Sequence, residues 1–360
     1  MIHRLYFPLP VLLLLTATFA SPPSIDHIDR SLVASGQGYF PVALRLKNGR
    51  IAVIMRGGGP HLSINGRLDI VFSDDDGKTW SKPTVVVDSP LDDRNPALGQ
   101  AVDGTIVVGF WRTARYDDQG RYNPSLDKPV STWTTRSADG GKTWSNPAPL
   151  DVADISWASP YGRMLALPDG AMLMSVYGGN PGASAKDKGA AAYVYRSTDN
   201  GKTWKRFSQI AAGYNETALL RLESGDLLAA LRSDTPQNLW LARSTDGGQT
   251  WSKPTPLTPA NVHPADMILL ADHRVLLTCG DRIGPTYGVR ALVGSKDGTF
   301  DWNDNAVLTA DATSRDCGYP SSILLRDGRV LTVYYKVGSK DKPQWGTHCG
   351  AMVYTLPPQR

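Results

Sequence analysis

The octapeptide SDDDGKTW at Ser73–Trp80 decides the fold, because closely similar copies recur along the chain. The other copies are SADGGKTW at Ser137–Trp144, STDNGKTW at Ser197–Trp204, STDGGQTW at Ser244–Trp251 and a degraded copy, SKDGTFDW, at Ser295–Trp302. Repetition at intervals of tens of residues is typical of repeat architectures. Each copy predicts a tight hairpin loop, in which the Asp bonds backbone N–H groups, the Gly takes a positive φ and the Trp buries its ring beneath the turn. We expect these loops to build the scaffold.

A second repeat runs in step with the octapeptides. Short apolar, β-branched stretches flank six tight turns, centred on Gly49, Gly104, Gly170, Gly225, His273 and Gly328. Asn-Gly and Asp-Gly pairs, which form most of these turns, are the strongest short-range signal for a β-hairpin. Five of the turns are followed by an octapeptide, so each unit reads as four strands. A four-stranded sheet matches one blade of a propeller. The sequence therefore predicts an all-β fold, a six-bladed β-propeller.

The last unit lacks a fourth strand, because the chain ends without a sixth octapeptide. An open ring would leave bare sheet edges. The segment 30–35 precedes the first unit, and we expect it to supply the missing strand and close the last blade. No linker or shift in composition divides the chain, so residues 27–360 are predicted to form one domain.

The N-terminus has the features of a secretory signal peptide at residues 1–20. A short basic start at His3 and Arg4 precedes the apolar run Leu9–Leu15, which is followed by small residues. The apolar run is too short to span a bilayer. We therefore expect a secreted or periplasmic protein without a membrane span.

Charge and cysteine usage exclude several functional classes. A formal net charge of +4 is too small to indicate binding to nucleic acid or to a membrane surface. The three cysteines, Cys279, Cys317 and Cys349, fit neither a disulfide scaffold nor a metal-ligand spacing. We expect a monomer that has no metal and no cofactor.

The octapeptides resemble the Asp boxes, or BNR repeats, of the sialidase (neuraminidase) superfamily, whose pattern is Ser-x-Asp-x-Gly-x-Thr-Trp. The resemblance covers nearly the whole chain after the signal peptide, and six blades is that family's number. It implies an exo-acting, retaining glycoside hydrolase that releases terminal sialic acid or a related acidic sugar from glycans. Because other glycosidases and binding proteins also carry Asp boxes, the function has to be argued from the site.

Counting from the turns places a group of arginines around the propeller axis. The second strand of a unit ends at Arg56 and at Arg232, Arg282 follows the equivalent position, and Arg94 begins an innermost strand. Several guanidinium groups with few carboxylates predict an anionic ligand, which the guanidinium fork binds well. The alternative is that each Arg pairs with a neighbouring carboxylate. A shift of one residue in strand alternation would also turn these side chains away.

The resemblance extends to four residues that carry chemistry. Asn215-Glu216-Thr217 and the strand ending at Arg232 look like the family's Asn-Glu strand and a substrate-binding Arg. Arg282 looks like another member of its arginine triad, and Gly318-Tyr319 looks like the segment with its catalytic Tyr. The resemblance implies that Tyr319 attacks, that Glu216 takes its proton, and that Arg232 and Arg282 hold the substrate carboxylate. A Tyr nucleophile avoids the repulsion between a carboxylate nucleophile and the carboxylate on the anomeric carbon.

The sequence departs from the family pattern at two places in the first unit. Tyr39-Phe40-Pro41 stands where the family has Arg-Ile-Pro, so Arg56 or Arg94 is expected to replace the first triad Arg. The loop 57–67 lacks the Asp that serves as the family's general acid. His61 is the one side chain of this loop with a pKa suited to proton transfer, and it is our candidate.

Three functions therefore remain open. The first is the exo-glycosidase described above. The second is a propeller lyase or hydrolase that acts on a uronic-acid polysaccharide and uses His61 or His263 with Tyr319. The third is a non-catalytic carbohydrate-binding propeller. Glu216 and Tyr319 together favour an enzyme, because a pure binding site does not need that pair. All three predict an acidic carbohydrate as the partner.

Overall fold

The structure is a computed structural model and describes residues 25, 27–152, 154–181 and 189–356. The predicted signal peptide at residues 1–20 lies outside the described residues. Within them the chain forms twenty-four strands and two short 3₁₀ helices, η1 (Trp302–Asp304) and η2 (Pro343–Trp345). The prediction of an all-β fold is confirmed. None of the helices in this part of the chain is long and apolar enough to cross a membrane.

The strands form successive antiparallel units. The first three units are β2 (Tyr39–Arg45), β3 (Ile51–Gly57), β4 (Arg67–Ser73) and β5 (Thr84–Val87); β6 (Asp92–Gln100), β7 (Ile106–Thr113), β8 (Val130–Ser137) and β9 (Ala148–Pro149); β10 (Ala158–Ala166), β11 (Met172–Gly179), β12 (Ala190–Ser197) and β13 (Lys205–Ala212). The next two are β14 (Tyr214–Arg221), β15 (Leu227–Ser233), β16 (Leu239–Ser244) and β17 (Thr255–Pro256); β18 (Val262–Leu269), β19 (Val275–Asp281), β20 (Tyr287–Gly294) and β21 (Ala306–Ala312). The last unit is β22 (Cys317–Leu324), β23 (Val330–Val337), β24 (Thr347–Tyr354) and β1 (Asp29–Ser35).

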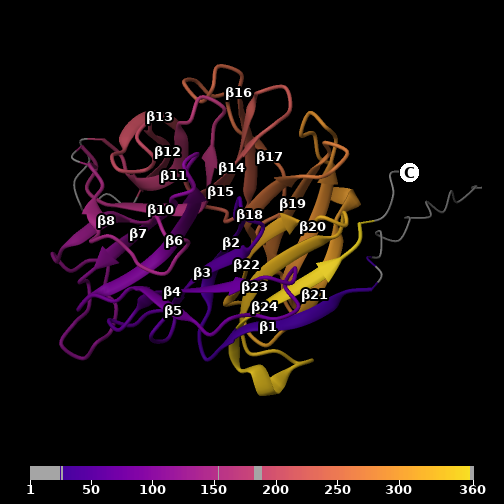
Figure 1. Ribbon diagram of the computed structural model, residues 1–360, viewed down its shortest axis with the longest axis horizontal. Coiled ribbons are helices and arrows are strands. Elements are labelled where there is room, and N and C mark those ends of the chain that lie inside the picture. Colours follow the sequence, from indigo (N-terminus) through magenta and orange to yellow (C-terminus); the bar gives the residue numbers. More distant parts are fainter. Residues whose placement is uncertain (1–24, 26, 153, 182–188, 357–360) are drawn as a thin grey trace, which may run out of the picture.

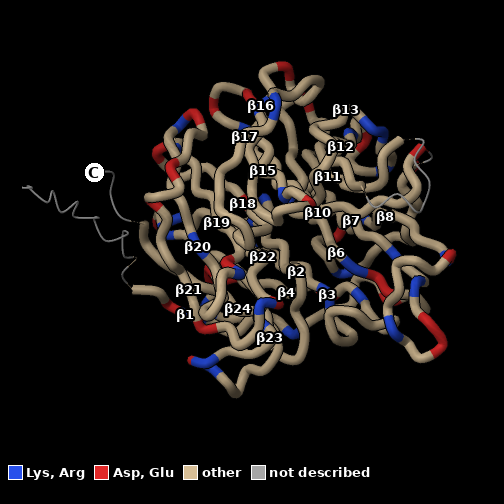
Figure 2. The backbone as a smooth tube through the Cα atoms, turned by 180° about the vertical axis from the view of Figure 1, so that it is seen from behind, with Lys and Arg blue, Asp and Glu red and all other residues tan. Residues whose placement is uncertain are grey.

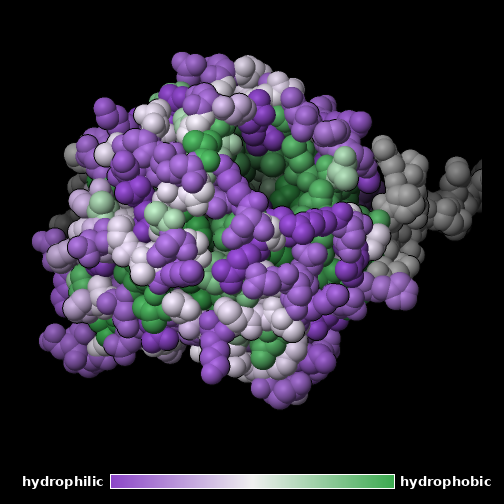
Figure 3. Space-filling view, viewed as in Figure 1, coloured by the Kyte–Doolittle hydropathy of each residue, from purple (hydrophilic) through white to green (hydrophobic). Residues whose placement is uncertain are grey.

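The units form a propeller-like arrangement of sheets (Figure 1). Four sheets have four strands, and a fifth sheet has eight, because the second and third units are joined by a parallel contact between β6 and β10. The innermost strands contact one another in the order β2, β6, β10, β14, β18, β22 and back to β2, so they close a ring. Charged residues of both signs lie around the outer loops (Figure 2), and one face of the molecule is hollowed near its centre (Figure 3).

The N-terminal strand closes the last unit as predicted. β1 pairs antiparallel with β24, with Leu32 opposite Gly350 and Arg30 opposite Met352. Val33 and Ala34 of β1 are buried in a core cluster that also contains Val333. A sheet edge that would otherwise be unpaired is therefore covered by hydrogen bonds and by apolar packing.

The core lies between neighbouring sheets. One cluster joins Val53 of the first unit to Val333 of the last, and another joins Leu173 of the third unit to Ala229 of the fourth. Sheets that pack face to face bury both sides of their inner strands, which explains why β3 is buried at every position. The backbone ends of the inner strands are thereby held in fixed positions around the axis.

The six turns predicted from the sequence are present. Gly49, Gly104, Gly170, Gly225 and Gly328 have φ between 85° and 95°, and His273 has φ 66°. Gly adopts a positive φ at little steric cost, and each of these positions lies in the turn between the first and second strands of a unit. The spacing of the turns was therefore a reliable guide to the ends of the inner strands.

The octapeptides connect the third and fourth strands of five units. In the first copy the Asp75 carboxylate accepts hydrogen bonds from the Thr79 backbone N–H at 2.9 Å and from its hydroxyl at 2.6 Å. The prediction for the Trp side chains was partly wrong, because Trp204 is fully buried but the other four Trp rings are only half-buried. Trp80 and Trp144, for example, pack against core clusters and remain partly exposed.

Acid is expected to weaken the fold through these loops. Hydrogen bonds from the Thr79 hydroxyl and backbone N–H lower the pKa of Asp75 from 3.8 to about 2. The unfolded chain then binds more protons, so the stability from Asp75 is present above its ordinary pKa and is lost as the pH falls through about 2. Thermal unfolding followed by circular dichroism from about pH 5 to about pH 2 checks this. The Asp75→Asn variant should show a shallower decline, and an unchanged slope would contradict the assignment.

Candidate functional site

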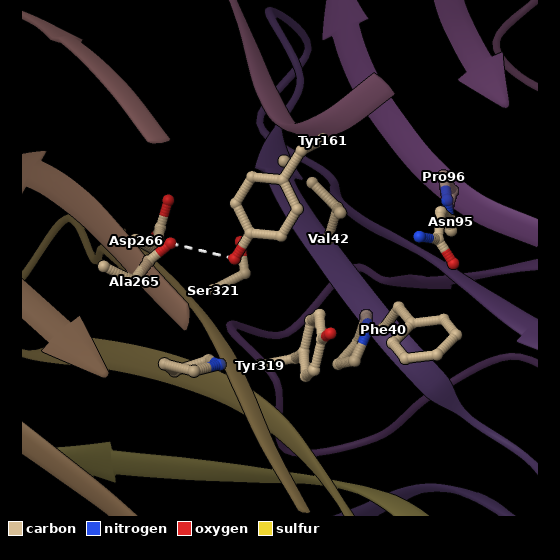
Figure 4. Close-up of a pocket in the computed structure, with 12 residues that line it drawn as sticks. Phe40, Val42, Asn95, Pro96, Tyr161, Ala265, Asp266, Tyr319 and Ser321 are labelled. Atoms are coloured by element: carbon tan, nitrogen blue, oxygen red, sulfur yellow. Dashed lines mark hydrogen bonds between the residues drawn. The ribbon is translucent and has the colours of Figure 1, made fainter. Parts of the chain in front are cut away.

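The candidate site lies at the N-terminal ends of the innermost strands. At that end the strands carry shifts in pairing register, which are β-bulges. The register shifts between Tyr39 and Val42 in β2, and between Gly318 and Ser321 in β22. Phe40 and Tyr319 have positive φ values of 54° and 48°. A non-Gly residue with positive φ at a bulge is uncommon, and such a bulge re-aims a side chain. The rings of Phe40 and Tyr319 consequently lie side by side near the axis, with centroids 4.8 Å apart (Figure 4).

Tyr319, Glu216 and Arg232 form a hydrogen-bonded chain across three strands. The Tyr319 hydroxyl of β22 donates to Glu216 Oε1 of β14 at 2.6 Å. Arg232 of β15 donates from Nη1 to Glu216 Oε2 at 2.5 Å. Tyr319 and Glu216 are buried, with 8% and 4% of their surface exposed. The structure thus joins a phenol, a carboxylate and a guanidinium that are up to 103 residues apart in the sequence.

The electrostatics of this chain keep the proton on Tyr319 in the free protein. Burial raises the pKa of Tyr319, and the charge of Glu216 raises it further, against the opposing effects of Arg232 and Arg282. Burial alone would lower the pKa of Arg232, but the charge and hydrogen bond of Glu216, together with Tyr319 and Tyr177, outweigh burial and raise the pKa. The phenol is therefore neutral and already hydrogen-bonded to the carboxylate that could accept its proton.

Arg282 lies beside the Tyr319 ring. Its Cζ atom is 5.4 Å from the ring centroid, and its Nε and Nη2 donate to the Cys317 carbonyl at 3.2 and 2.9 Å. No carboxylate of the described residues forms an ion pair with Arg282. The buried Nε of Arg232 likewise has no hydrogen-bond partner within the described part of the chain. These two arginines retain donors for an anion.

Arg56 and Arg94 belong to a different cluster, which is built around Asp92. Arg56 is fully buried and donates to Asp92 Oδ1 from Nε at 3.1 Å and from Nη2 at 2.8 Å. Its remaining donors bond the carbonyls of Gly59, Pro60 and Ser63. Arg94 is also buried and donates to Asp92 Oδ2 at 3.2 Å. Arg56 thus has the carboxylate partner anticipated as the alternative, and the structure does not bring it to the Tyr319–Glu216 pair.

His61 lies beside the Phe40 ring. Its Nδ1 atom is 2.9 Å from Asp316 Oδ1 and 3.0 Å from Oδ2, and its ring centroid is 4.9 Å from that of Phe40. The Tyr335 hydroxyl donates to the same Asp316 Oδ1 at 2.5 Å. The Phe40 ring therefore contacts both His61 and Tyr319.

His263 is placed differently from His61. It is fully buried, and neither ring nitrogen has a hydrogen-bond partner among the described residues. Burial lowers its pKa to about 2, and the charges of Arg232 and Arg282 act in the same direction. His263 is a neutral, enclosed ring, which makes it a poor candidate for contact with a substrate.

The space along the axis beneath Tyr319 is narrow. It is lined by Phe40, Tyr161 and Ser321, among others, and the Tyr161 hydroxyl donates to the Ala265 carbonyl at 3.0 Å across it (Figure 4). Its volume of about 10 Å³ is enough for roughly one water. This space is therefore too small to hold a sugar ring. No group of three His, Cys, Asp or Glu side chains in the described residues could hold a metal ion.

Sequence reasoning missed two acidic residues that organise the region, Asp92 and Asp316. Asp92 precedes Arg94 by two residues, and Asp316 precedes Tyr319 by three. Both lie at the start of an innermost strand, so the repeat register places them at the same end of the ring as Arg94 and Tyr319. Their partners Arg56 and His61 come from another unit or loop and could not be read from local spacing.

Comparisons with known proteins agree with this architecture. A sialidase from Paraclostridium sordellii is 25% identical over 189 residues, which are 45% of this chain and 43% of the relative. The chain thus matches less than half of the length of that curated relative. A structure of a protein of unknown function from Dyadobacter fermentans has a TM-score of 0.78 at 26% identity and covers 92% of this chain and 100% of that one.

A second solved structure, a Hadza microbial sialidase, has a TM-score of 0.69 at 17% identity. It covers 89% of this chain and 66% of its own chain, and at that identity it shows a shared fold. The family model described as "BNR repeat-like domain" matches residues 56–332. Since that match includes most of the sequence, the chain belongs to the BNR repeat-like domain family.

Proposed function

We propose that the protein is a retaining, exo-acting glycosidase that releases terminal sialic acid or a closely related acidic sugar from glycans. The observation that carries the proposal is the hydrogen bond of 2.6 Å from the Tyr319 hydroxyl to Glu216, beside two arginines with free donors. The similarity to sialidases from Paraclostridium sordellii and from a Hadza microbial source supports the same chemistry. A pure binding site has no need for a buried phenol–carboxylate pair.

The chemistry follows from the hydrogen-bonded chain. Tyr319 oxygen attacks the anomeric carbon while Glu216 takes the phenol proton, and the glycosidic C–O bond breaks as the aryl glycoside forms. Water then attacks the anomeric carbon, and Tyr319 regains its proton from Glu216 as the sugar is released. Two displacements at one carbon retain its configuration. A neutral phenol approaches an anomeric carbon that bears a carboxylate more readily than a charged carboxylate does.

The substrate carboxylate is assigned to Arg282 and Arg232. Arg282 has no carboxylate partner in the described part of the chain, and Arg232 bonds Glu216 through Nη1, which leaves its Nη2 for the substrate. Guanidinium groups that are partly removed from water bind a carboxylate strongly and with defined geometry. The site therefore uses two arginines, while Arg56 is committed to Asp92 and to the loop carbonyls.

Hydrolysis of an aryl α-sialoside by the full chain tests the proposal. Proton NMR should detect the α-anomer as the first product, and a 3-fluoro-sialosyl fluoride should leave a sugar adduct on the peptide that contains Tyr319. First release of the β-anomer would overturn the retaining mechanism. Elimination from a uronic-acid polysaccharide, seen as a rise in ultraviolet absorbance, would show that the protein is a lyase and not a hydrolase. Binding of intact glycan without any product would replace it with a binding propeller.

Arg282→Ala is expected to lower kcat/KM on an acidic sugar by about 10²-fold or more, because loss of a partly buried charge contact costs roughly 2–5 kcal/mol. Arg282→Lys should recover only part of the activity, since an ammonium group lacks the planar fork. The control is inhibition by the free acidic monosaccharide and by its methyl ester. The wild-type protein should prefer the acid, and Arg282→Ala should lose that preference. An unchanged preference would remove Arg282 from the carboxylate site.

A further inference from the structure

We propose that His61 and Asp316 form an acid–base dyad in which His61 protonates the leaving group and Asp316 positions His61. The two residues come from the first and the last unit, 255 positions apart in the sequence. The inference rests on the proposed glycosidase function. The loop 57–67 has no Asp, and the dyad supplies a proton donor in that loop. Asp316 is a positioning residue, and His61 is the residue that contacts the substrate.

The hydrogen bond between the two residues fixes which ring nitrogen carries the proton. Burial alone would raise the pKa of Asp316, but the hydrogen bond and charge of His61, the hydrogen bond from Tyr335 and the charge of Arg282 together lower it. An ionised Asp316 can only accept hydrogen bonds, so His61 Nδ1 must donate, at 2.9 and 3.0 Å from the two oxygens. The Nε2 atom is then the nitrogen that can exchange a proton with a substrate.

The loop around His61 is held rigidly by the Asp92 cluster. Arg56 donates to the carbonyls of Gly59, Pro60 and Ser63, which flank His61 on both sides. The Phe40 ring packs against His61 and against Tyr319, with centroid distances of 4.9 and 4.8 Å. The fully buried Arg56 thus has a role in this site that is not substrate binding. It fixes the backbone that holds His61 against the Phe40 ring, which also packs against Tyr319.

Other titratable groups near His61 are less suited to protonate the leaving group. Asp316 is ionised at neutral pH and has no proton to give. Burial raises the pKa of Tyr39 and of Tyr335, so both phenols are weak acids. Glu216 already accepts the Tyr319 proton, and the nearby cations Arg56 and Arg282 cannot act as acids.

The proton balance of the proposed reaction closes with this dyad. As the Tyr319 oxygen bonds to the anomeric carbon, protonated His61 gives its Nε2 proton to the departing glycosidic oxygen, which leaves as an alcohol. Neutral His61 then removes a proton from the attacking water, and Glu216 returns its proton to Tyr319 as the aryl glycoside breaks. Each half-reaction moves one proton through His61, so no other reactant is required.

The decisive experiment compares two leaving groups on the full-length chain. A sialyl-oligosaccharide needs protonation of its departing alcohol, whereas a 4-nitrophenyl α-sialoside does not. His61→Gln should lower kcat/KM on the oligosaccharide by about 10²- to 10⁴-fold but on the aryl substrate by less than about 10-fold. Asp316→Asn, which keeps the shape of the side chain, should give the same selective pattern with a smaller loss.

Tyr335→Phe is the matched control, since it removes the other hydrogen bond to Asp316 Oδ1 and leaves His61 in contact with both oxygens. If Asp316 acted only by holding Tyr335, Tyr335→Phe would reproduce the pattern of Asp316→Asn and the dyad would be wrong. Equal losses on both substrates in the His61 variant, or no loss on either, would also overturn the dyad while the glycosidase function stands. A wild-type protein that hydrolyses neither substrate would overturn the proposed function itself, and the dyad with it.

Discussion

Tyr319→Phe is expected to lower kcat/KM on an aryl α-sialoside by about 10³-fold or more, the scale seen when a nucleophile is removed. The change removes a single oxygen atom, the atom that donates to Glu216 Oε1 at 2.6 Å. The ring remains and still fills its place beside Phe40 and Tyr335, with centroids 4.8 and 5.6 Å away. Steady-state kinetics with the aryl substrate measure the loss, and the fluorinated probe should no longer label this peptide.

Tyr161→Phe provides the control for Tyr319→Phe. Tyr161 is also buried, its ring centroid is 6.3 Å from that of Tyr319, and its hydroxyl bonds the Ala265 carbonyl instead of a carboxylate. We expect Tyr161→Phe to keep most of the activity, because that hydroxyl spans the axis below the site. Equal turnover by the wild type and the Tyr319→Phe variant would exclude Tyr319 as the nucleophile. A comparable loss in both variants would indicate disturbed packing near the axis.

The repeats made the fold predictable, because turn chemistry is local. Asn-Gly and Asp-Gly turns impose a positive φ at one residue, and the octapeptide closes a loop with its own Ser, Asp and Thr side chains. Neither feature depends on distant parts of the chain. Even the closing strand could be predicted, since a missing fourth strand at one end and an unused apolar strand at the other are both visible in the sequence.

The chemical site was only partly predictable, because its contacts depend on the geometry between units. The repeat register and the family resemblance brought Glu216, Arg232 and Tyr319 to one region, and the structure joins them by hydrogen bonds. The register did not reveal the bulge that rotates the Tyr319 side chain toward the axis. The register also did not show which arginines would form ion pairs, since ion pairing depends on carboxylates from other strands.

The two arginine clusters differ in how their carboxylate is shared and not in net charge, since each has two arginines and one acid. Asp92 faces both Arg56 and Arg94 and also accepts from the Tyr116 hydroxyl at 2.6 Å, so this cluster is internally satisfied. Around Tyr319, Glu216 is shared between a phenol and Arg232, and Arg282 has no acidic partner within the described residues. The guanidinium of Arg282 beside Tyr319 is therefore the one that an acidic ligand could engage with a carboxylate.

Asp92→Ala is expected to lower the free energy of unfolding by about 3–5 kcal/mol, the usual cost of leaving a buried partner charge unpaired. Arg56 has no exposed surface and would lose both hydrogen bonds to Asp92 Oδ1. Arg94, which is also buried, would lose its one ionic partner in the described part of the chain. Because Arg56 also anchors the loop that carries His61, the variant should lose activity preferentially on the sialyl-oligosaccharide. Equilibrium unfolding in urea measures the change in stability.

Two further variants separate charge from shape in this prediction. Asp92→Asn keeps an oxygen acceptor for Arg56, so we expect a smaller loss of stability than in Asp92→Ala. Asp74→Ala removes an acid whose side chain is 71% exposed and which pairs with Arg50 at 2.8 Å; surface pairs of this kind contribute about 0–1 kcal/mol. The expected order of stability loss is Asp92→Ala, then Asp92→Asn, then Asp74→Ala. If Asp92→Ala were no more damaging than Asp74→Ala, the buried Arg56 would not depend on Asp92, and the loop 57–67 would need another anchor.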